Sequence, residues 1–199
     1  MRKVDSLAAP RRCIASLLCA GALLLTSGCA TNGPLSANEL HALAKPSPDV
    51  AATVEKLQPG VARYIREAEQ IGLTQGQPLD EAQLQLARTV GVAEPERVRV
   101  VVTQRFPVAS DADLAAQLSK RFGIGPAANG GLTMGHTIFI AEKYAGKRWL
   151  LAHELTHVAQ FERFGVERFA HDYLVQMLVV GYARAPLERD AAANEPLGK

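Results

Sequence analysis

The sequence predicts one α+β domain that is mostly helical, with a small sheet beside a central helix. Two observations carry this prediction. After about residue 60, most segments repeat apolar residues at helical spacing, and only the segments 97–103 and 132–141 are predicted to be strands. The central helix starts near Lys147 and carries the pattern His153-Glu-Leu-Thr-His157. The expected order is therefore strand, helix, strand and central helix.

Residues 1–28 are interpreted as a signal peptide and kept out of the fold. Four basic residues, Arg2, Lys3, Arg11 and Arg12, precede the apolar run 14–25, which is short for a membrane span. The run ends in Leu25-Thr-Ser-Gly-Cys29, which resembles the signal box of bacterial lipoproteins. This resemblance implies a lipid on Cys29 that anchors the chain to a membrane. Ala30 then implies the outer membrane, facing the periplasm; ordinary secretion or an uncleaved anchor are the alternatives.

Cysteine and charge counts limit the chemistry of the mature chain. The only cysteines are Cys13, Cys19 and Cys29, so cleavage before Cys29 leaves one cysteine and no disulfide. The totals are 22 basic and 20 acidic residues, and the first 28 residues hold four of the basic and one of the acidic ones. The remainder is nearly neutral and has no basic run. We therefore expect no nucleic-acid partner.

Residues 29–59 are expected to form a tether with short helical pieces, because prolines interrupt them. The domain is expected to span 60–199. Its first two elements, 61–71 and 79–90, have the spacing of amphipathic helices, and both are expected to pack rather than to catalyse.

The middle of the chain supplies the predicted sheet. The β-branched segment 97–103 lies between prolines and predicts a strand. Ser110-Asp-Ala-Asp is a helix start, and the helix that follows is expected to stop at Gly123. A loop rich in Gly, Pro and Asn leads to the segment 132–141, which is predicted to be the second strand.

The spacing of His153 and His157 predicts a metal site. On an α-helix, residues four apart lie one above the other on a single face, so the two imidazoles can bind one Zn²⁺. Glu154 is rotated by about 100° from His153, which leaves its carboxylate beside the metal. Glu154 can then take a proton from water as a general base. Leu155 and Val158 belong to a core stripe next to these side chains.

The chain after the central helix is also predicted to be helical. Gly165 is the expected stop, and the apolar segment 166–182 is too short and too interrupted by polar residues to span a membrane. It is expected to pack against the central helix. Pro186 then lies at a helix start, which puts Glu188 in the first turn of a returning helix.

Two segments carry a family resemblance. Gly135-His-Thr-Ile-Phe-Ile140 and Leu150-Leu-Ala-His-Glu-Leu-Thr-His-Val-Ala-Gln160 resemble a predicted metallopeptidase domain found in bacterial secreted proteins and in extracellular contractile injection system cores. The resemblance covers about residues 97–195. More broadly the chain is similar to gluzincins, zinc peptidases in which a glutamate on a later helix completes a His, His, Glu site. This likeness implies a zincin-like fold and a peptide or protein substrate.

The gluzincin likeness also indicates the third ligand, which catalytic zinc usually needs besides water. Glu188 and Ala191 match the Glu-x-x-Ala part of the pattern Glu-x-x-Ala-Asp, but Ala192 replaces its aspartate. Glu188 is the expected ligand, with Glu195 or Asp190 as alternatives. The absent aspartate normally supports a zinc-binding histidine, a role that Asp190 or Asp172 could take.

Other residues carry weaker expectations. His136 and His171 could be ligands or act in the transition state, and Tyr182 could donate to an oxyanion; each is more often a surface or packing residue. In zinc peptidases a strand at the edge of the cleft pairs with the substrate backbone. The candidate edge consists of Thr137, Ile138, Phe139 and Ile140, with a core strand as the equal alternative.

These patterns together predict a zinc-dependent peptidase that is anchored to the cell envelope as a lipoprotein. The alternative is a binding or structural lipoprotein in which zinc stabilises the fold without turnover.

Overall fold

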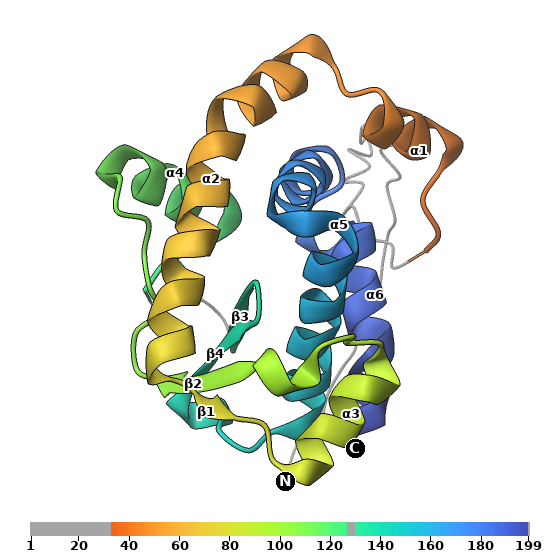
Figure 1. The fold of residues 1–199 in the computed structure, drawn as a ribbon. Helices are drawn as coiled ribbons and strands as arrows, with labels where there is room; N and C mark the ends of the chain where they lie inside the picture. The colour runs from red at the N-terminus through yellow and green to blue at the C-terminus, as the bar shows by residue number, and fades with distance from the viewer. Residues whose placement is uncertain (1–32, 127–129, 199) are drawn as a thin grey trace, which may run out of the picture. The chain divides into compact units, whose positions relative to one another are not determined.

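The computed structural model describes residues 33–126 and 130–198. The fold is α+β and mostly helical, with one small mixed sheet, which confirms the predicted class (Figure 1). Residues 32–199 cluster as one unit. The expected signal peptide and Cys29 lie outside the described residues. Within the described residues, no helix combines the length and apolar character needed to cross a membrane.

The N-terminal helices extend the domain beyond the predicted boundary. Helix α1 (Ala37–Ala44) starts with a capping box at Ser36, and α2 (Pro48–Gln75) starts at a serine cap. The sequence interpretation placed a tether up to residue 59, but α2 continues through Pro59 with Val54 and Leu57 buried. Burial of this apolar face outweighs the hydrogen bond that proline cannot donate. Residues 48–59 are therefore part of the folded domain.

Two shorter helices follow the predicted patterns. Helix α3 (Glu81–Val90) begins with an Asp80 capping box and ends at a left-handed Gly91. Helix α4 (Ala112–Phe122) is capped by Asp111, within the predicted helix start, and ends at a left-handed Gly123 as expected. Between them lie a short 3-10 turn, Pro95–Arg97, and strand β2 (Arg99–Thr103).

The sheet has four strands in the order β1-β2-β4-β3. Strand β1 (Gln77–Pro78) pairs antiparallel with β2, and β2 pairs parallel with β4 (Thr137–Ala141). Strand β3 (Gly131–Met134) returns antiparallel along the other side of β4. The segment 132–141 is thus a hairpin, because Gly135 turns the chain with a φ of 60°.

This topology corrects the expected substrate edge. The strand that contains Thr137, Ile138, Phe139 and Ile140 lies between β2 and β3, and these side chains are buried. It is therefore an internal strand. Among the described residues β4 is the one strand that pairs with β3, so β3 forms the edge on this side of the sheet. The sequence interpretation missed the turn at Gly135 and so merged an inner strand with an outer one.

The long helix α5 (Arg148–Val179) follows a 3-10 turn at Glu142–Tyr144 and changes direction at Gly165, whose φ is 74°. The predicted stop is thus a kink between two helical halves. A 3-10 turn, Tyr182–Arg184, leads to α6 (Pro186–Asn194), which has proline at its first turn as expected, and the chain ends in the 3-10 segment Glu195–Gly198.

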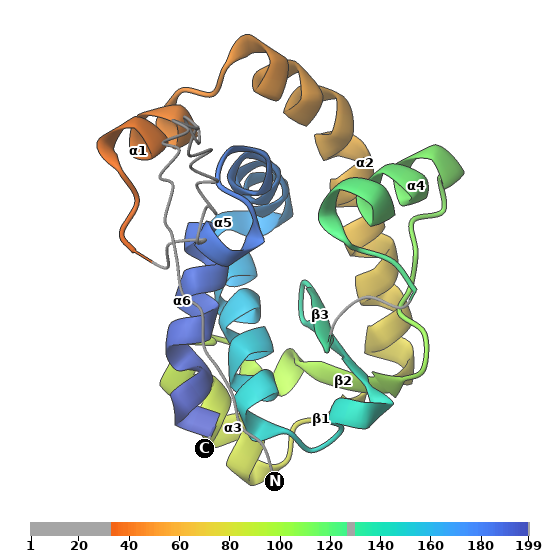
Figure 2. The same ribbon diagram turned by 180° about the vertical axis from the view of Figure 1, so that it is seen from behind.

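Two hydrophobic clusters surround α5. One joins α5 to α2 and α4, and the other joins it to α3 and strands β2 and β4. Seen from behind, α6 lies along α5, and α4 lies beside α2 (Figure 2). The first half of α5 is consequently covered on several sides.

Gly72 marks a close approach between α2 and the sheet. A Cβ atom at Gly72 would lie 1.8 Å from Cγ2 of Thr137 on β4. We expect Gly72→Ala to lower the free energy of unfolding by about 1–3 kcal/mol, because overpacking costs that much. Gly60→Ala, on the same helix, is the control, since its Cβ would meet only the flexible end of Leu114. Equal stability of the two variants in chemical denaturation would contradict this packing.

Candidate metal centre

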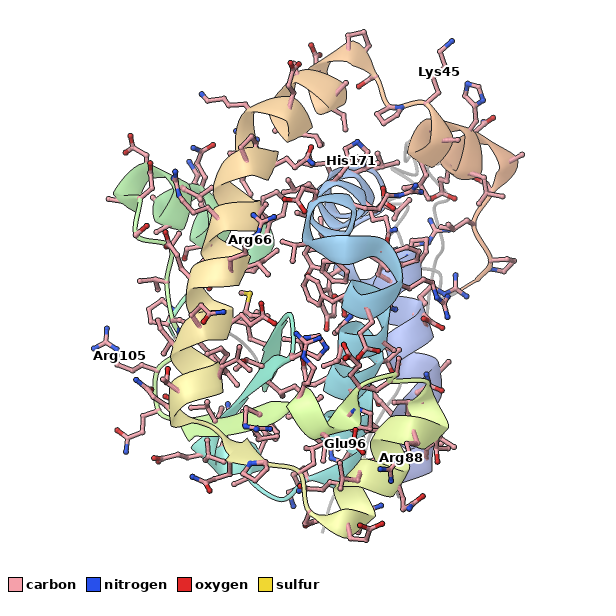
Figure 3. All side chains as sticks on the ribbon, viewed as in Figure 1. Lys45, Arg66, Arg88, Glu96, Arg105 and His171 are labelled. Atoms are coloured by element: carbon pink, nitrogen blue, oxygen red, sulfur yellow. The ribbon has the colours of Figure 1, made fainter. Side chains whose placement is uncertain are left out.

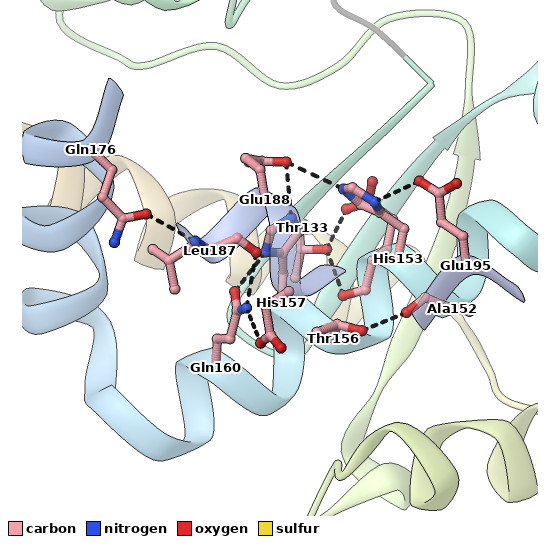
Figure 4. A network of polar contacts seen from close by, with 12 residues as sticks. Thr133, Ala152, His153, Thr156, His157, Gln160, Gln176, Leu187, Glu188 and Glu195 are labelled. Carbon is pink, nitrogen blue, oxygen red and sulfur yellow. Dashed lines mark hydrogen bonds and ion pairs between the residues drawn. The ribbon is translucent and has the colours of Figure 1, made fainter. Parts of the chain in front are cut away.

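Two histidines of α5 and one glutamate of α6 bring their donor atoms together in the core (Figure 4). Nε2 of His153 lies 3.4 Å from Oε2 of Glu188, and Nε2 of His157 lies 3.6 Å from the same oxygen. All three residues are buried. Neither contact has hydrogen-bond geometry, so this Oε2 has no hydrogen-bond partner among the described residues. A buried carboxylate oxygen without a donor is costly, and a cation between the three atoms would remove that cost.

The outward-facing nitrogens of both imidazoles have carboxylate or amide acceptors. Nδ1 of His153 lies 3.1 Å from Oε1 of Glu195, and Nδ1 of His157 lies 2.8 Å from Oε1 of Gln160. The Gln160 amide nitrogen donates to the Leu187 carbonyl, which fixes the orientation of the amide. Each Nδ1 atom therefore carries a hydrogen, which leaves each Nε2 atom to bind either a metal ion or a proton on the side of Glu188. Against the effect of burial, Glu188 raises the pKa of both histidines, so without a metal their charged forms are favoured.

This set of atoms fits Zn²⁺. Two imidazole nitrogens and one carboxylate oxygen form a ligand set of catalytic zinc, with a fourth position left for water. Zinc-to-ligand distances near 2.0 to 2.1 Å in a tetrahedron separate neighbouring donor atoms by roughly 3.3 Å. The contacts of 3.4 and 3.6 Å to Glu188 are close to that separation.

The structure distinguishes the three acidic candidates for the third ligand. Glu188 lies in the first turn of α6 and joins the histidines, and fully buried Ala191 allows α6 to approach α5 closely. Glu195 contacts the outer side of His153 instead. Asp190 accepts a 2.8 Å hydrogen bond from Gln160, which in turn contacts His157.

Other residues contact the outer nitrogens of the two histidines in place of the absent aspartate. Where the gluzincin pattern has Asp, this chain has Ala192, and Glu195 supplies the carboxylate to His153 one turn later. Gln160 links Asp190 to His157. The sequence suggested Asp190 for such a role but not Glu195 or Gln160. Asp172 contacts Arg168 and not a metal-site histidine.

Glu154 points toward β3. Its side chain is buried, and the Thr133 hydroxyl donates a 2.6 Å hydrogen bond to Oε2. A Cβ at Gly131 would lie 2.3 Å from Oε1, so only glycine lets β3 approach the carboxylate this closely. Gly131 and Thr133 are two residues apart, so they lie on the same face of the strand. The sequence analysis did not predict a role for either residue. Had β3 been recognised as a separate strand, the i, i+2 spacing of the two residues would have indicated that they share a face.

Burial and charge oppose each other in this cluster. Burial raises the pKa of Glu154, and the neighbouring charges of His157 and His153 offset part of this rise. Burial alone would also raise the pKa of Glu188, but its contacts with His153 and His157 outweigh burial and lower it below the usual range. Glu188 is therefore held as a carboxylate, the form that binds a metal.

His136 lies in a second cluster. Its ring nitrogens contact Oε1 of Glu69 at 3.4 Å and Oε1 of Glu162 at 3.2 Å, so it links α2 and α5 to the β3–β4 turn. Glu94 lies close enough to complete a second set of potential ligands. However, Arg97 pairs with Glu94, and the Glu162 oxygens accept backbone N–H groups. We interpret this cluster as a structural link.

His136 also predicts a pH dependence of stability. The hydrogen bond with Glu69 raises the pKa of His136 above its ordinary value of 6.5, against burial and Arg97, and Glu162 adds to the rise. Protonated His136 therefore stabilises the fold fully below about pH 6.5, and this contribution is lost as pH rises through the raised pKa.

We expect the free energy of unfolding, measured with zinc present, to fall more steeply above pH 6.5 in the unsubstituted protein than in His136→Gln. Chemical denaturation at a series of pH values measures this difference. Parallel curves for the two proteins would show that His136 does not carry the expected charge.

The remaining candidates lie differently. His171 is exposed on the second half of α5 (Figure 3), contacts Asp172 and is not part of the group formed by His153, His157 and Glu188. The structure thus gives no support to a ligand role for His171. Tyr182 is 46% exposed and lines the same cavity as the metal centre, which leaves a donor role open to it.

Part of the chain around this site is similar to a known protein family. Residues 109–164 match the family described as the eCIS core domain. This segment is thus similar to a domain of extracellular contractile injection systems. It includes α4, the β3–β4 hairpin and the first half of α5 with His153, Glu154 and His157, and it ends before α6 and Glu188. No curated protein and no solved structure matches the chain.

Proposed function

We propose that the protein is a zinc-dependent peptidase that hydrolyses peptide bonds in a peptide or protein substrate. The observation that carries the proposal is the buried, unpartnered Oε2 of Glu188, which faces two Nε2 atoms beside the carboxylate of Glu154. Perturbed, buried titratable groups next to a cavity are typical of active sites. The eCIS-related segment is compatible with the proposal and does not test it.

In this proposal, His153, His157 and Glu188 hold Zn²⁺. Bound there, zinc would lower the pKa of a coordinated water and polarise the carbonyl of the scissile bond. Glu154 accepts the proton of the attacking water and delivers it to the leaving amine. The hydrogen bond from Thr133 orients the Glu154 carboxylate for this task. Thr133 is thus a positioning residue.

Strand β3 is the proposed support for the substrate backbone. It is an edge strand among the described residues, and Gly131 and Thr133 on it contact Glu154. An extended peptide that pairs with β3 would add a strand to the sheet and run past the metal centre. This assigns to β3 the role that the sequence interpretation gave to β4.

For the whole chain we propose attachment to the bacterial envelope through a lipid on Cys29, most simply at the outer membrane. This part of the proposal rests on the sequence of residues 1–30.

A chelation experiment tests the peptidase proposal. The purified domain is expected to cleave an unfolded protein, to lose this activity with a strong zinc chelator, and to regain it when zinc is restored. Zinc binding without any cleavage of unfolded proteins or peptide mixtures would instead favour the alternative, a binding or structural protein stabilised by zinc.

A further inference from the structure

A cavity of about 240 Å³ adjoins the metal centre. Its polar end contains the two histidines with Glu154, Glu188 and Glu195, and the rest of its lining is mainly apolar and aromatic. The apolar lining comes from separate elements: Val61 and Tyr64 of α2, Leu118 and Phe122 of α4, and Trp149 and Phe161 of α5.

None of the described residues that line the cavity is Lys or Arg, and its two histidines lie at the polar end. The apolar end therefore offers no cation to an acidic side chain. The hydroxyl of Tyr64 donates to the Pro107 carbonyl, and that of Thr133 donates to Glu154. A charged side chain that entered the apolar end would lose its hydration without gaining an ion pair. An apolar side chain would gain free energy by leaving water.

The size of the cavity suits a ring or a large aliphatic group. An apolar cavity of about 150 Å³ binds benzene in another protein. A volume of about 240 Å³ therefore accommodates a phenyl or isobutyl group with room for part of a backbone. The residues that hold the proposed reaction share the lining, so a side chain in the cavity lies next to the reacting bond.

We propose that this cavity is the specificity pocket of the enzyme and takes a large apolar side chain, such as that of Phe, Tyr or Leu, adjacent to the scissile bond. The role of the cavity in substrate specificity rests on the proposed peptidase function. The selective binding of apolar side chains does not require zinc or turnover.

Trp149 provides a direct readout, because it is the only tryptophan of the chain and lines the cavity. Metal-free full-length protein is titrated with N-acetyl-phenylalanine amide and N-acetyl-aspartic acid amide, and the fluorescence of Trp149 is followed. We expect the phenylalanine compound to bind at least ten-fold more tightly, since a single methylene in an apolar pocket is worth roughly 10–200-fold.

Matched variants distinguish binding in the cavity from other effects of introducing a phenylalanine. Val61→Phe fills the cavity, and Val108→Phe makes the same change at an exposed position outside it. Ile124→Phe fills the cavity from a half-buried position and serves if Val61→Phe does not fold. We expect either filling variant to weaken binding of the phenylalanine compound at least ten-fold and Val108→Phe to leave it unchanged. Equal binding of the two compounds, or unchanged binding in the filling variants, would overturn the proposal.

Cleavage of a peptide mixture by the zinc-loaded protein completes the experiment. Cleavage beside Phe, Tyr or Leu at least ten-fold faster than beside Asp supports the pocket, whereas cleavage without such preference overturns it. Selective binding by the metal-free protein without any cleavage would refute the peptidase function and leave the apolar binding site standing. The two failures are therefore distinguishable.

Discussion

Glu188→Ala is expected to weaken zinc binding by more than roughly 100-fold. Loss of a residue that only supports a metal ligand typically weakens binding by roughly 10–100-fold, and Glu188 is proposed to be a ligand itself. Glu188 contributes one of three donor atoms, and its Oε2 faces both Nε2 atoms in the core. Alanine would leave two histidines as the protein ligands and would open space between α5 and α6. Competition with a calibrated zinc chelator measures the change in affinity.

Glu195→Ala is the matched control for this experiment. Glu195 contacts Nδ1 of His153 rather than the metal-facing nitrogen, and its side chain is 33% exposed, so water can replace it. We expect a loss in zinc affinity of about ten-fold or less. If Glu195→Ala were the more damaging of the two, Glu195 would be the ligand, and the position of α6 along α5 would be wrong.

Glu154→Gln is expected to retain zinc and to lower the rate of peptide hydrolysis by about 10²- to 10⁴-fold, the usual contribution of a general base. Glutamine nearly preserves the shape of the buried side chain and can still accept the hydrogen bond from Thr133. It cannot accept the proton from water. Steady-state rates and zinc content are measured on the same preparation, so that loss of metal is not mistaken for loss of the base.

The exposed Glu142, on the turn before α5, supplies the control for Glu154. Glu142→Gln makes the same chemical change and should leave both zinc content and rate unaltered. A Glu154→Gln protein with an unchanged rate would rule out Glu154 as the base.

Much of the site follows from local rules of the sequence. Helical spacing places His153 and His157 on one face, and the proline at the start of α6 sets the position of Glu188 relative to the turn before it. Both rules depend only on residues close in the chain. The helix caps at Asp80 and Gly123 follow for the same reason.

The features that were missed depend on contacts between distant segments. The link from Glu195 to His153 spans 42 residues, and the one from Thr133 to Glu154 spans 21. No periodicity within a helix or strand encodes either contact. Helix α2 was cut short at Pro59 because local propensity disfavours proline inside a helix, whereas packing against the core decides the outcome.

The most direct test of the zinc centre is the metal content of the purified domain, measured by elemental analysis in the unsubstituted protein and in His157→Ala. The proposal predicts about one zinc ion per chain in the first and a large loss in the second, because His157 supplies one of the three donor atoms. Retention of stoichiometric zinc in folded His157→Ala, or absence of zinc from the unsubstituted protein after incubation with the metal, would contradict it.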